Sequence, residues 1–379
     1  MTRTLLIVLQ VLYFTSSQAP VRQTTPFAGL VARLSEPGGF FDSDNLVSNE
    51  TSYLHVVPAL HALGVRGGAY LGVGPEQNFS YLAEIRPDLA LLIDIRRDNM
   101  LLHLLFKAMF ETAENRIQYL CLLYGRPAPP NPSQWNTRSL EEILLYLEFT
   151  PGDSALHAAN HAALMERVTG YGVPLTAVDR QTLERFHAEF ATAGLNLRYT
   201  SLGRPSRPDY PSQRDLYSAT DLDGQQVSYL SSEERFRIVR DLERQDRIVP
   251  VVGDLSGPIA MRAIAAYLKE TGRTVSAMYV SNVEMYLFRQ GTFGRYAENV
   301  RALPSTPGSV IVRSSFGRGW WRGPEPGPVP RPLPGQLSVQ LMQTFGSFLD
   351  LTARGDSVGY WELLINSAVD LHPAARPPF

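Results

Sequence analysis

The chain has 379 residues, of which 44% are hydrophobic and 19% are charged, and its formal net charge is −2. This is the composition of a globular protein with a sizeable core, and the near-neutral charge provides no global basic field to attract nucleic acid or an anionic membrane. A local basic patch is not excluded by these values. The single cysteine, Cys121, excludes a disulfide framework and a cysteine-based metal site.

The N-terminus has the pattern of a targeting segment. Arg3 precedes the apolar run LLIVLQVLYF, and Ser17 and Ala19 then have the spacing of a signal-peptidase site. The run is too short to span a bilayer, which takes about 20 apolar residues. We therefore expect residues 1–19 to be a cleaved signal peptide and the protein to be exported to the periplasm or beyond the cell. If these residues instead form a buried or amphipathic helix, the protein would be cytoplasmic. No later segment predicts a transmembrane span.

Helix and strand signals alternate in the first third of the chain. Apolar residues spaced three and four apart indicate helices, whereas uninterrupted apolar runs indicate strands that are covered on both faces. In chain order, the predicted elements are a helix at 27–36, a helix at about 50–63, a strand in GGAYLGVG, a helix at about 77–85, a strand in DLALLIDI that closes on Asp94, and a long helix at about 99–123.

The remainder of the chain is first helical and then returns to alternation. Residues 138–195 predict helix in three pieces, which proline and glycine separate. The further predicted elements are a polar loop at about 201–230, a helix whose capping box pairs Ser231 with Glu234, a strand in IVPVVGDL, a helix at about 258–271, strands in TVSAMYVSN and GSVIVRSSF, a proline-rich loop at 322–336, and a helix followed by the strand YWELLIN over about 337–367.

This alternation predicts an α/β fold of the Rossmann-like type, in which helices cover both faces of a mostly parallel sheet. The stretch from 99 to 245 is too long and too helical for one crossover, so we expect a helical insertion at about 125–245. The single domain would cover 20–367, with a proline-rich tail at 368–379. In such sheets, ligands bind outside the carboxyl ends of the strands, near the point where the strand order reverses. The strand ends are therefore the candidate site.

The first strand ends in the glycine turn GVGPEQN at 72–78. Glycine permits a tight turn and a close approach of ligand to backbone, and the following helix points free N–H groups at the pocket. Glutamine stands in place of the third glycine of G-x-G-x-x-G, so a purely structural strand-to-helix turn is the alternative. The cofactor-binding residues expected in this turn are Gly72, Gly74, Glu76, Gln77 and Asn78.

Asp94 ends the second strand, twenty residues after Gly74. An acid in this place can accept hydrogen bonds from both hydroxyls of a ribose. Arg96 is expected to contribute to cofactor binding as well, because Arg96 and Arg97 could meet a phosphate, as in sites for NADP. The alternative is that Asp94 caps a helix or pairs with one of these arginines.

The later strand ends carry Asp254 and, farther along, Asn282 and Glu284. Asp254 is expected to accept a hydrogen bond from an adenine amino group. Asn282 and Glu284 are the candidate catalytic residues, since they would orient or deprotonate a group that reacts with the cofactor. Helix capping is the alternative role for Asp254 and Asn282.

Polar residues are also dense upstream of the first strand, in FDSDNLVSNE. They could form a lid over the pocket, and helix capping in a solvated loop is the alternative. The candidate lid residues are Asp42, Asp44, Asn45, Asn49 and Glu50. No metal is expected, because the pair His157 and His161 in HAANH lacks the glutamate of H-E-x-x-H. The expected partner is a small molecule, and the sequence does not predict an oligomeric state.

The order of a glycine loop, an acidic strand end, a Gly-Asp strand end and a polar strand end resembles class I S-adenosylmethionine-dependent methyltransferases. The resemblance implies that Gly72 and Gly74 pass the methionine part of the cofactor. It implies that Asp94 holds the ribose, that Asp254 contacts adenine and that Asn282 lies on the substrate side. S-adenosylmethionine would then be the cofactor, and a methyl group would be transferred to an acceptor that the sequence does not name.

The segments SEPGGFFDSDNLVSNE, VGPEQNFSYL, DIRRDN and YVSNVEMYLF are more specifically similar to an uncharacterised bacterial family whose members often carry signal sequences. This similarity covers about residues 27–367. The chain departs from the methyltransferase pattern at Tyr70-Leu71, where an acid is usual, and at the missing third glycine. Export also conflicts with a cytoplasmic cofactor. The alternatives are therefore a non-catalytic exported protein that binds a small ligand or a protein partner, and a nucleotide- or NADP-binding protein.

Overall fold

The computed structural model describes residues 26–204, 207–316, 331–355 and 358–367. The expected signal peptide, the proline-rich tail and most of the proline-rich loop lie outside these residues. Among the residues described, no helix is both long enough and apolar enough to cross a membrane.

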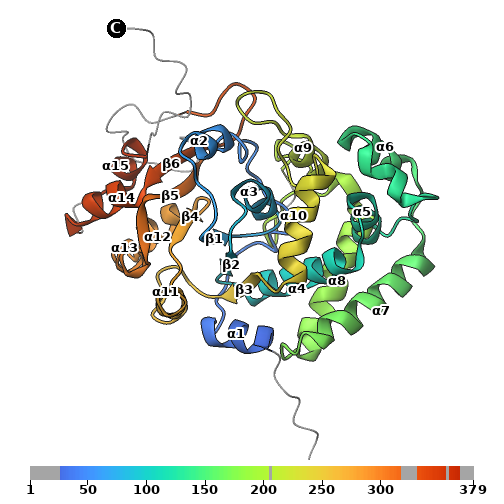
Figure 1. Ribbon diagram of the computed structural model, residues 1–379, viewed down its shortest axis with the longest axis horizontal. Coiled ribbons are helices and arrows are strands. Elements are labelled where there is room, and N and C mark those ends of the chain that lie inside the picture. Colours follow the sequence, from blue (N-terminus) through green and yellow to red (C-terminus); the bar gives the residue numbers. More distant parts are fainter. Residues whose placement is uncertain (1–25, 205–206, 317–330, 356–357, 368–379) are drawn as a thin grey trace, which may run out of the picture.

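Six strands of the described chain form one sheet in the order β3-β2-β1-β4-β5-β6 (Figure 1). Strands β1 to β5 are parallel and β6 is antiparallel to β5. This confirms the predicted α/β fold with a mostly parallel sheet, and the order is compatible with a Rossmann-like fold. The order reverses between the neighbours β1 and β4, where a crevice is expected. The strands are β1 Ala69–Val73, β2 Leu89–Asp94, β3 Ile248–Val252, β4 Val275–Tyr279, β5 Ser305–Ser315 and β6 Val339–Thr344.

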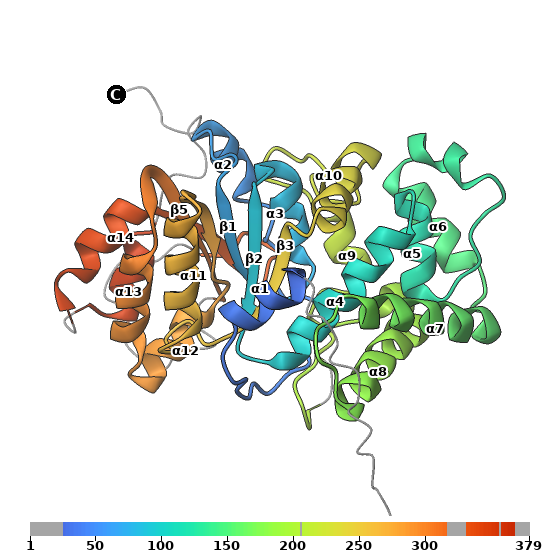
Figure 2. The same ribbon diagram turned by 60° about the horizontal axis from the view of Figure 1, so that its bottom comes forward.

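Helices cover both faces of the sheet (Figure 2). On one face, α3 packs against α10, and on the other α1 and α13 pack against α11. Each presents an apolar stripe to the core, as α11 does with Ala260, Ile264 and Leu268. These sheet-covering helices are α1 Pro26–Leu34, α3 Gln77–Ile85, α10 Glu233–Arg244, α11 Ala260–Glu270 and α13 Phe293–Ala302.

The crossover from β2 to β3 is helical and projects to one side of the sheet (Figure 1). The three helical pieces predicted within 138–195 are present as α6, α7 and α8. The crossover ends in α10, which packs on α3 and α4 and so belongs to the cover of the sheet. The helices before α10 are α4 Arg97–Thr112, α5 Arg116–Tyr124, α6 Leu140–Phe149, α7 Ser154–Gly170, α8 Ala177–Ala193 and α9 Gln213–Ser218, with single 3-10 turns at Pro132–Thr137 and Gly194–Asn196.

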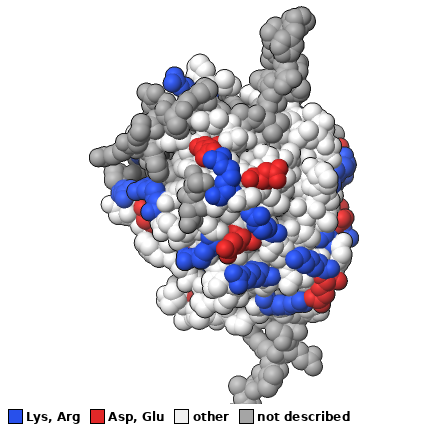
Figure 3. All heavy atoms as spheres, turned by 90° about the vertical axis from the view of Figure 1, so that its left-hand side faces the viewer, with Lys and Arg blue, Asp and Glu red and all other residues white. Residues whose placement is uncertain are grey.

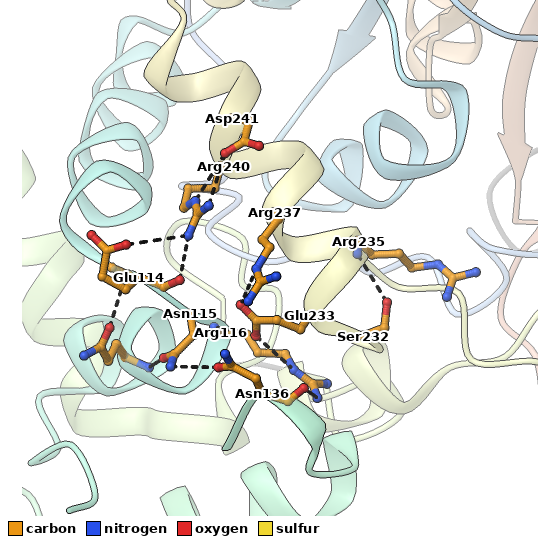
Figure 4. A network of polar contacts seen from close by, with 12 residues as sticks. Glu114, Asn115, Arg116, Asn136, Ser232, Glu233, Arg235, Arg237, Arg240 and Asp241 are labelled. Atoms are coloured by element: carbon orange, nitrogen blue, oxygen red, sulfur yellow. Dashed lines mark hydrogen bonds and ion pairs between the residues drawn. The ribbon is translucent and has the colours of Figure 1, made fainter. Parts of the chain in front are cut away.

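A polar network fastens α5 to α10 (Figure 4). The buried Arg116 donates a hydrogen bond to Leu230 O at 2.9 Å, and its Nε lies 3.6 Å from the Glu233 carboxylate. Arg240 of α10 donates to the backbone oxygen of Glu114 at 2.6 Å. A buried charge that loses its partner is left without either a counter-ion or water to solvate it. Two buried charged partners therefore keep a single arrangement. The crossover is thus fixed to the helix that covers the sheet.

Three helix boundaries differ from the prediction. The expected helix at 99–123 is two helices, because Asn115 adopts an extended conformation and its side chain caps α5 by accepting from Gln118 N. Ser232, not Ser231, caps α10 by accepting from Arg235 N. The helix expected at about 50–63 is reduced to α2, Val57–Ala62, which follows a run of turns.

The C-terminal order is the reverse of the prediction. VQLMQT forms β6, which pairs with β5 at the edge of the sheet. It is followed by α14, Phe345–Thr352, and YWELLI is the helix α15, Tyr360–Ile365. The buried residues Tyr360, Leu363 and Leu364 have helical spacing, which the aromatic and β-branched composition of the segment concealed.

The face formed by α13, α14 and their neighbours carries both signs of charge. Figure 3 shows basic side chains spread over this face with acidic side chains between them. Arg354 of the loop after α14 forms an ion pair with Glu362 of α15. Mixed charges of this kind support solubility and add little to stability individually.

Candidate functional site

The carboxyl ends of four parallel strands meet at one pocket of about 150 Å³. It lies where the strand order reverses, which is where ligands bind in open α/β sheets. The segment 40–50 and the side chains of Tyr199 and Tyr286 enclose it from the other side. The strand-end residues that line it are Val73 at the end of β1 and Gly74 after it, Ile93 and Asp94 in β2, Gly253 and Asp254 after β3, and Ser281 and Asn282 after β4.

Gly74 lines the pocket, whereas Gly72 serves the turn behind it. Gly74 has φ +82°, a conformation that favours glycine. A Cβ on Gly72 would lie 2.0 Å from the Asn78 side-chain oxygen, so glycine is required there by packing. Asn78 donates hydrogen bonds to Val73 O at 3.0 Å and Pro75 O at 2.8 Å. The expectation that Gly72 and Asn78 contact a cofactor is therefore corrected: they shape the turn that carries Gly74.

His103 of α4 forms a hydrogen bond with the same turn. Its Nε2 donates to Gly74 O at 2.9 Å, because a carbonyl oxygen can only accept. Burial lowers the pKa of His103 to about 4, so the imidazole is neutral near pH 7. No motif spacing links the two residues, since His103 stands 29 residues after Gly74.

Glu76 is also absent from the pocket. Its side chain turns toward α9, where it accepts hydrogen bonds from Gln213 Nε2, from Tyr217 OH at 3.0 Å and from Tyr229 OH at 2.8 Å. Burial raises the pKa of Glu76 to about 7, although these hydrogen bonds act in the opposite direction. Its expected role in cofactor binding is replaced by a structural one, which joins the glycine turn to the crossover.

Asp94 lines the pocket and is held by Arg96. The Arg96 Nε lies 3.1 Å from Oδ1 and Nη2 lies 3.1 Å from Oδ2, and the Arg96 backbone N–H also donates to Oδ1 at 2.9 Å. Three of about four acceptor positions on the carboxylate are therefore filled. Asp94 cannot accept from both ribose hydroxyls in this arrangement, so the expected bidentate contact is corrected to a single remaining position.

Both arginines of DIRRDN have partners within the protein. The Nη1 of Arg96 donates to Ser43 O at 2.7 Å and to Asp44 O at 2.5 Å, which ties the segment 40–50 to the end of β2. Arg97 pairs with Asp179, with its Nε 3.0 Å from Oδ1. Arg97 does not line the pocket, and four of the five N–H groups of the Arg96 guanidinium donate within the protein, which disfavours the phosphate contact expected for an NADP site.

Asp254 retains an acceptor oxygen that faces no donor in the described residues. Its Oδ1 accepts from Ser256 N at 2.8 Å and Ser256 Oγ at 3.0 Å, as in a capping turn. Glu36 caps the following helix by accepting from Ile259 N and Ala260 N. Asp254 therefore does not cap this helix, and its Oδ2 can accept a hydrogen bond from a ligand.

The two candidate catalytic residues lie in different surroundings. Asn282 lines the pocket. Glu284 faces away from it and forms a buried ion pair with Arg313, with Nε 2.6 Å from Oε2, and it accepts from Tyr296 OH at 3.0 Å. Glu284 lies in the first turn of α12, Val283–Gln290, which directs its side chain toward β5 and α13. The expected role of Glu284 as a base at the ligand is therefore corrected.

The segment 40–50 contributes more to the pocket than the sequence indicated. Phe40, Phe41, Asn45, Asn49 and Glu50 line it. Of the candidate lid residues, Asn45, Asn49 and Glu50 do so, whereas Asp42 and Asp44 form ion pairs with arginines outside it. The ring of Phe41 meets that of Tyr286 edge-on, with centroids 5.4 Å apart. No motif spacing signals such contacts, because the segment reaches the strand ends only in three dimensions.

The charges that line the pocket are mostly negative. Among the residues described, they are the carboxylates Glu50, Asp94 and Asp254 and the guanidinium of Arg96, which is paired with Asp94. No lysine or histidine lines the pocket in this part of the chain. A cationic ligand is therefore favoured over an anionic one.

One family profile matches the two segments 45–126 and 180–358, which together make up more than half of the chain. The chain belongs to the family described as Domain of unknown function (DUF7790). The DUF7790 match contains all the strands of the sheet and the four strand ends of the pocket. The intervening residues 127–179, which contain α6 and α7, fall outside the match. A comparison with curated proteins found no match.

Proposed function

We propose that the protein binds S-adenosylmethionine in the strand-end pocket and directs its methyl group to a small acceptor. The observation that carries the proposal is the convergence of Gly74, Asp94, Asp254 and Asn282 at the point where the strand order reverses. The cofactor would supply an activated methyl group on a sulfonium, and the protein would bind and orient it. A small-molecule site at this place agrees with the rule for open α/β sheets.

Charge supports a sulfonium ligand over a dinucleotide. S-adenosylmethionine carries a cationic sulfur, whereas NADP carries several phosphates. Two opposite unit charges about 4 Å apart attract by about 4 kcal/mol at an effective dielectric constant of 20, and two like charges repel by the same amount. Because Arg96 is bound to Asp94, the carboxylates of Glu50 and Asp254 have no cationic partner in the pocket lining. They would attract the sulfonium of S-adenosylmethionine and repel the phosphates of NADP.

Each end of the pocket offers suited groups. Asp254 Oδ2 can accept from the amino group of an adenine, and Asp94 has one acceptor position for a ribose hydroxyl. The glycine backbone at Gly74 permits close approach of the sulfonium part of the cofactor. Asn282 lies at the end of β4, where its amide can hydrogen-bond an acceptor.

The pocket volume of about 150 Å³ is below the range of about 300–1,000 Å³ that is usual for small-molecule sites. The segment 40–50 lines the pocket and is held to the end of β2 through Arg96. Binding of a nucleoside-sized ligand therefore requires this segment to move outward. The exposed Phe40, at 78% exposure, marks the part of the segment with the fewest contacts to lose.

A second candidate function is ligand binding without catalysis. Its support is the position of Glu284, whose carboxylate is closed off by Arg313, and the absence of histidine and lysine from the described pocket lining. A methyl transfer that needs a proton removed would then depend on the acceptor itself. The two candidates share the ligand and differ in turnover.

Isothermal titration calorimetry tests the proposal. We expect S-adenosylmethionine and S-adenosylhomocysteine to bind, NADP not to bind, and Asp254→Ala to weaken the first two at least tenfold. The matched control is Glu234→Ala, which removes an exposed carboxylate paired only with Arg86. Absence of binding by either nucleoside would refute the proposal. Binding without transfer of labelled methyl to any added small acceptor would support the second candidate.

A further inference from the structure

Glu50 is a buried carboxylate at the pocket wall, and neutral groups alone surround it in the described structure. Its residue is 1% exposed. It accepts hydrogen bonds from Tyr279 OH at 2.6 Å, from Gln340 Nε2 at 2.8 Å, and from the hydroxyls of Ser281 and Ser314. No lysine, arginine or histidine of the described residues forms an ion pair with it. A buried carboxylate usually has a cationic partner, because desolvation of the charge is costly.

The four donors are distributed unevenly between the two oxygens of Glu50. Tyr279, Ser314 and Gln340 donate to Oε2, whereas Ser281 is the donor to Oε1. A carboxylate oxygen accepts about two hydrogen bonds. Oε1 therefore has room for one further donor, and Glu50 lines the pocket from which that donor would come.

Gln77 adds a second unfilled acceptor to the same wall. It is 7% exposed, and its Nε2 lies 3.3 Å from Tyr279 OH. The Tyr279 proton goes to Glu50, and burial together with the charge of Glu50 raises the pKa of Tyr279, so this proton is retained. The tyrosine oxygen must then accept from the Gln77 nitrogen. This fixes the orientation of the amide and leaves Gln77 Oε1 buried without a donor.

We propose that Glu50 and Gln77 together bind a positively charged amino group of the ligand. An ammonium has three N–H donors and no acceptor, so it can serve both Glu50 Oε1 and Gln77 Oε1 and also neutralise the carboxylate. A hydroxyl would serve one of them and leave the charge unbalanced. The proposal rests on the proposed function only for the identity of the ligand. The ammonium belongs either to the amino-acid end of S-adenosylmethionine or to the methyl acceptor.

The first test compares two nucleosides by calorimetry. S-adenosylhomocysteine has an amino-acid end, and 5′-methylthioadenosine lacks it. If the ammonium is that of the cofactor, wild-type protein prefers S-adenosylhomocysteine at least tenfold, and Glu50→Gln and Gln77→Leu each reduce this ratio to about one. The ratio within one variant is independent of a general loss of folded protein. Glu76→Gln is the matched control, because it alters a buried, neutrally surrounded glutamate outside the pocket and should leave the ratio unchanged.

The second test does not need nucleoside binding. The affinities of n-butylammonium and n-butanol are measured by ligand-observed NMR with the same variants. We expect n-butylammonium to bind wild-type protein, to bind Glu50→Gln at least tenfold more weakly, and n-butanol to distinguish none of the variants. If n-butylammonium gives this result while the nucleosides do not bind, the ammonium site is supported and the proposed function is refuted. If the nucleosides bind with an unaltered ratio, the ammonium belongs to the acceptor. Equal affinity of n-butylammonium for wild type and Glu50→Gln, or no binding to wild type, overturns the inference.

Discussion

Glu50 and Glu76 are buried glutamates, one in the segment 40–50 and the other in the β1–α3 turn, and they differ in what their side chains contact beyond their hydrogen bonds. Both are surrounded by tyrosine hydroxyls and side-chain amides. In both residues one donor reaches Oε1 and the other donors reach Oε2. The Glu76 side chain contacts the crossover, whereas Glu50 lines the pocket, from which a ligand can donate to Oε1. The burial of a carboxylate therefore does not decide its role, whereas access of the carboxylate to a pocket does.

Glu284 extends the comparison, because it is equally buried but has a cationic partner. Its ion pair with Arg313 satisfies its charge within the protein, so it has no need of a ligand. Four variants test whether buried polar groups that are satisfied within the protein differ in this way from groups that line the pocket. The variant with the largest expected effect comes first.

Glu284→Gln should have the largest effect on stability. It leaves the guanidinium of Arg313 buried without its counter-ion, and we expect the free energy of unfolding to fall by about 3–5 kcal/mol. Urea unfolding followed by circular dichroism measures the change. The double variant Glu284→Met, Arg313→Met should recover most of the loss. A loss below about 1 kcal/mol would show that Arg313 does not depend on Glu284 for neutralisation of its buried charge.

Glu76→Gln should alter the pH dependence of stability. The folded pKa of about 7 lies above the ordinary value of 4.5, so the unfolded chain releases its proton first as the pH rises. The Glu76 contribution to stability therefore falls between about pH 4.5 and pH 7, by up to about 3 kcal/mol, and is level above that range. Over this pH range, the unfolding free energy of the wild type should therefore fall by this amount relative to that of the variant. A difference that is constant from pH 4.5 to 7.5 contradicts the assignment.

Arg96→Gln should loosen the segment 40–50. It removes the hydrogen bonds to Ser43 O and Asp44 O, and we expect a loss of about 1–3 kcal/mol together with faster amide exchange in that segment. Arg97→Gln is the matched control, because Arg97 pairs with Asp179 away from the pocket. Equal acceleration in both variants would mean that the segment is not held through Arg96.

Phe40→Ala should have the smallest effect. The side chain is 78% exposed, so we expect a stability change within about 0.5 kcal/mol. Affinity for S-adenosylhomocysteine, measured by calorimetry, should change by no more than about threefold, because we place the main ligand contacts at the strand ends and not at the Phe40 ring. A loss greater than tenfold would move the main binding surface from the strand ends to the mouth of the pocket.

Much of the fold is encoded in local patterns. The helix expected at about 77–85 is α3 with the same bounds, and the strand expected to close on Asp94 is β2. The mostly parallel sheet follows from uninterrupted apolar runs that alternate with helices. The reversed C-terminal order shows the limit, because a short segment such as YWELLI has both helical spacing and strand-like composition.

The site was less predictable, because its contacts join distant parts of the chain. Spacing placed Gly74, Asp94, Asp254 and Asn282 at strand ends, and these residues line one pocket. Spacing cannot reveal the direction of a side chain within a turn, which separates Gln77 from its neighbour Glu76. The role of Glu50 depends on Ser314 and Gln340, more than 260 residues away in sequence. Such a cluster is formed by strand pairing and has no local signature.

Hydrogen exchange with and without S-adenosylhomocysteine, read by mass spectrometry, tests the central claim most directly. We predict slower exchange at all four strand ends together, in peptides covering 73–78, 94–96, 253–256 and 281–283, and altered exchange in the segment 40–50. The helices α6 and α7 should be unaffected, because they lie outside the pocket lining. Protection confined to other segments, or no protection at saturating ligand, would contradict the claim that these strand ends form the ligand site.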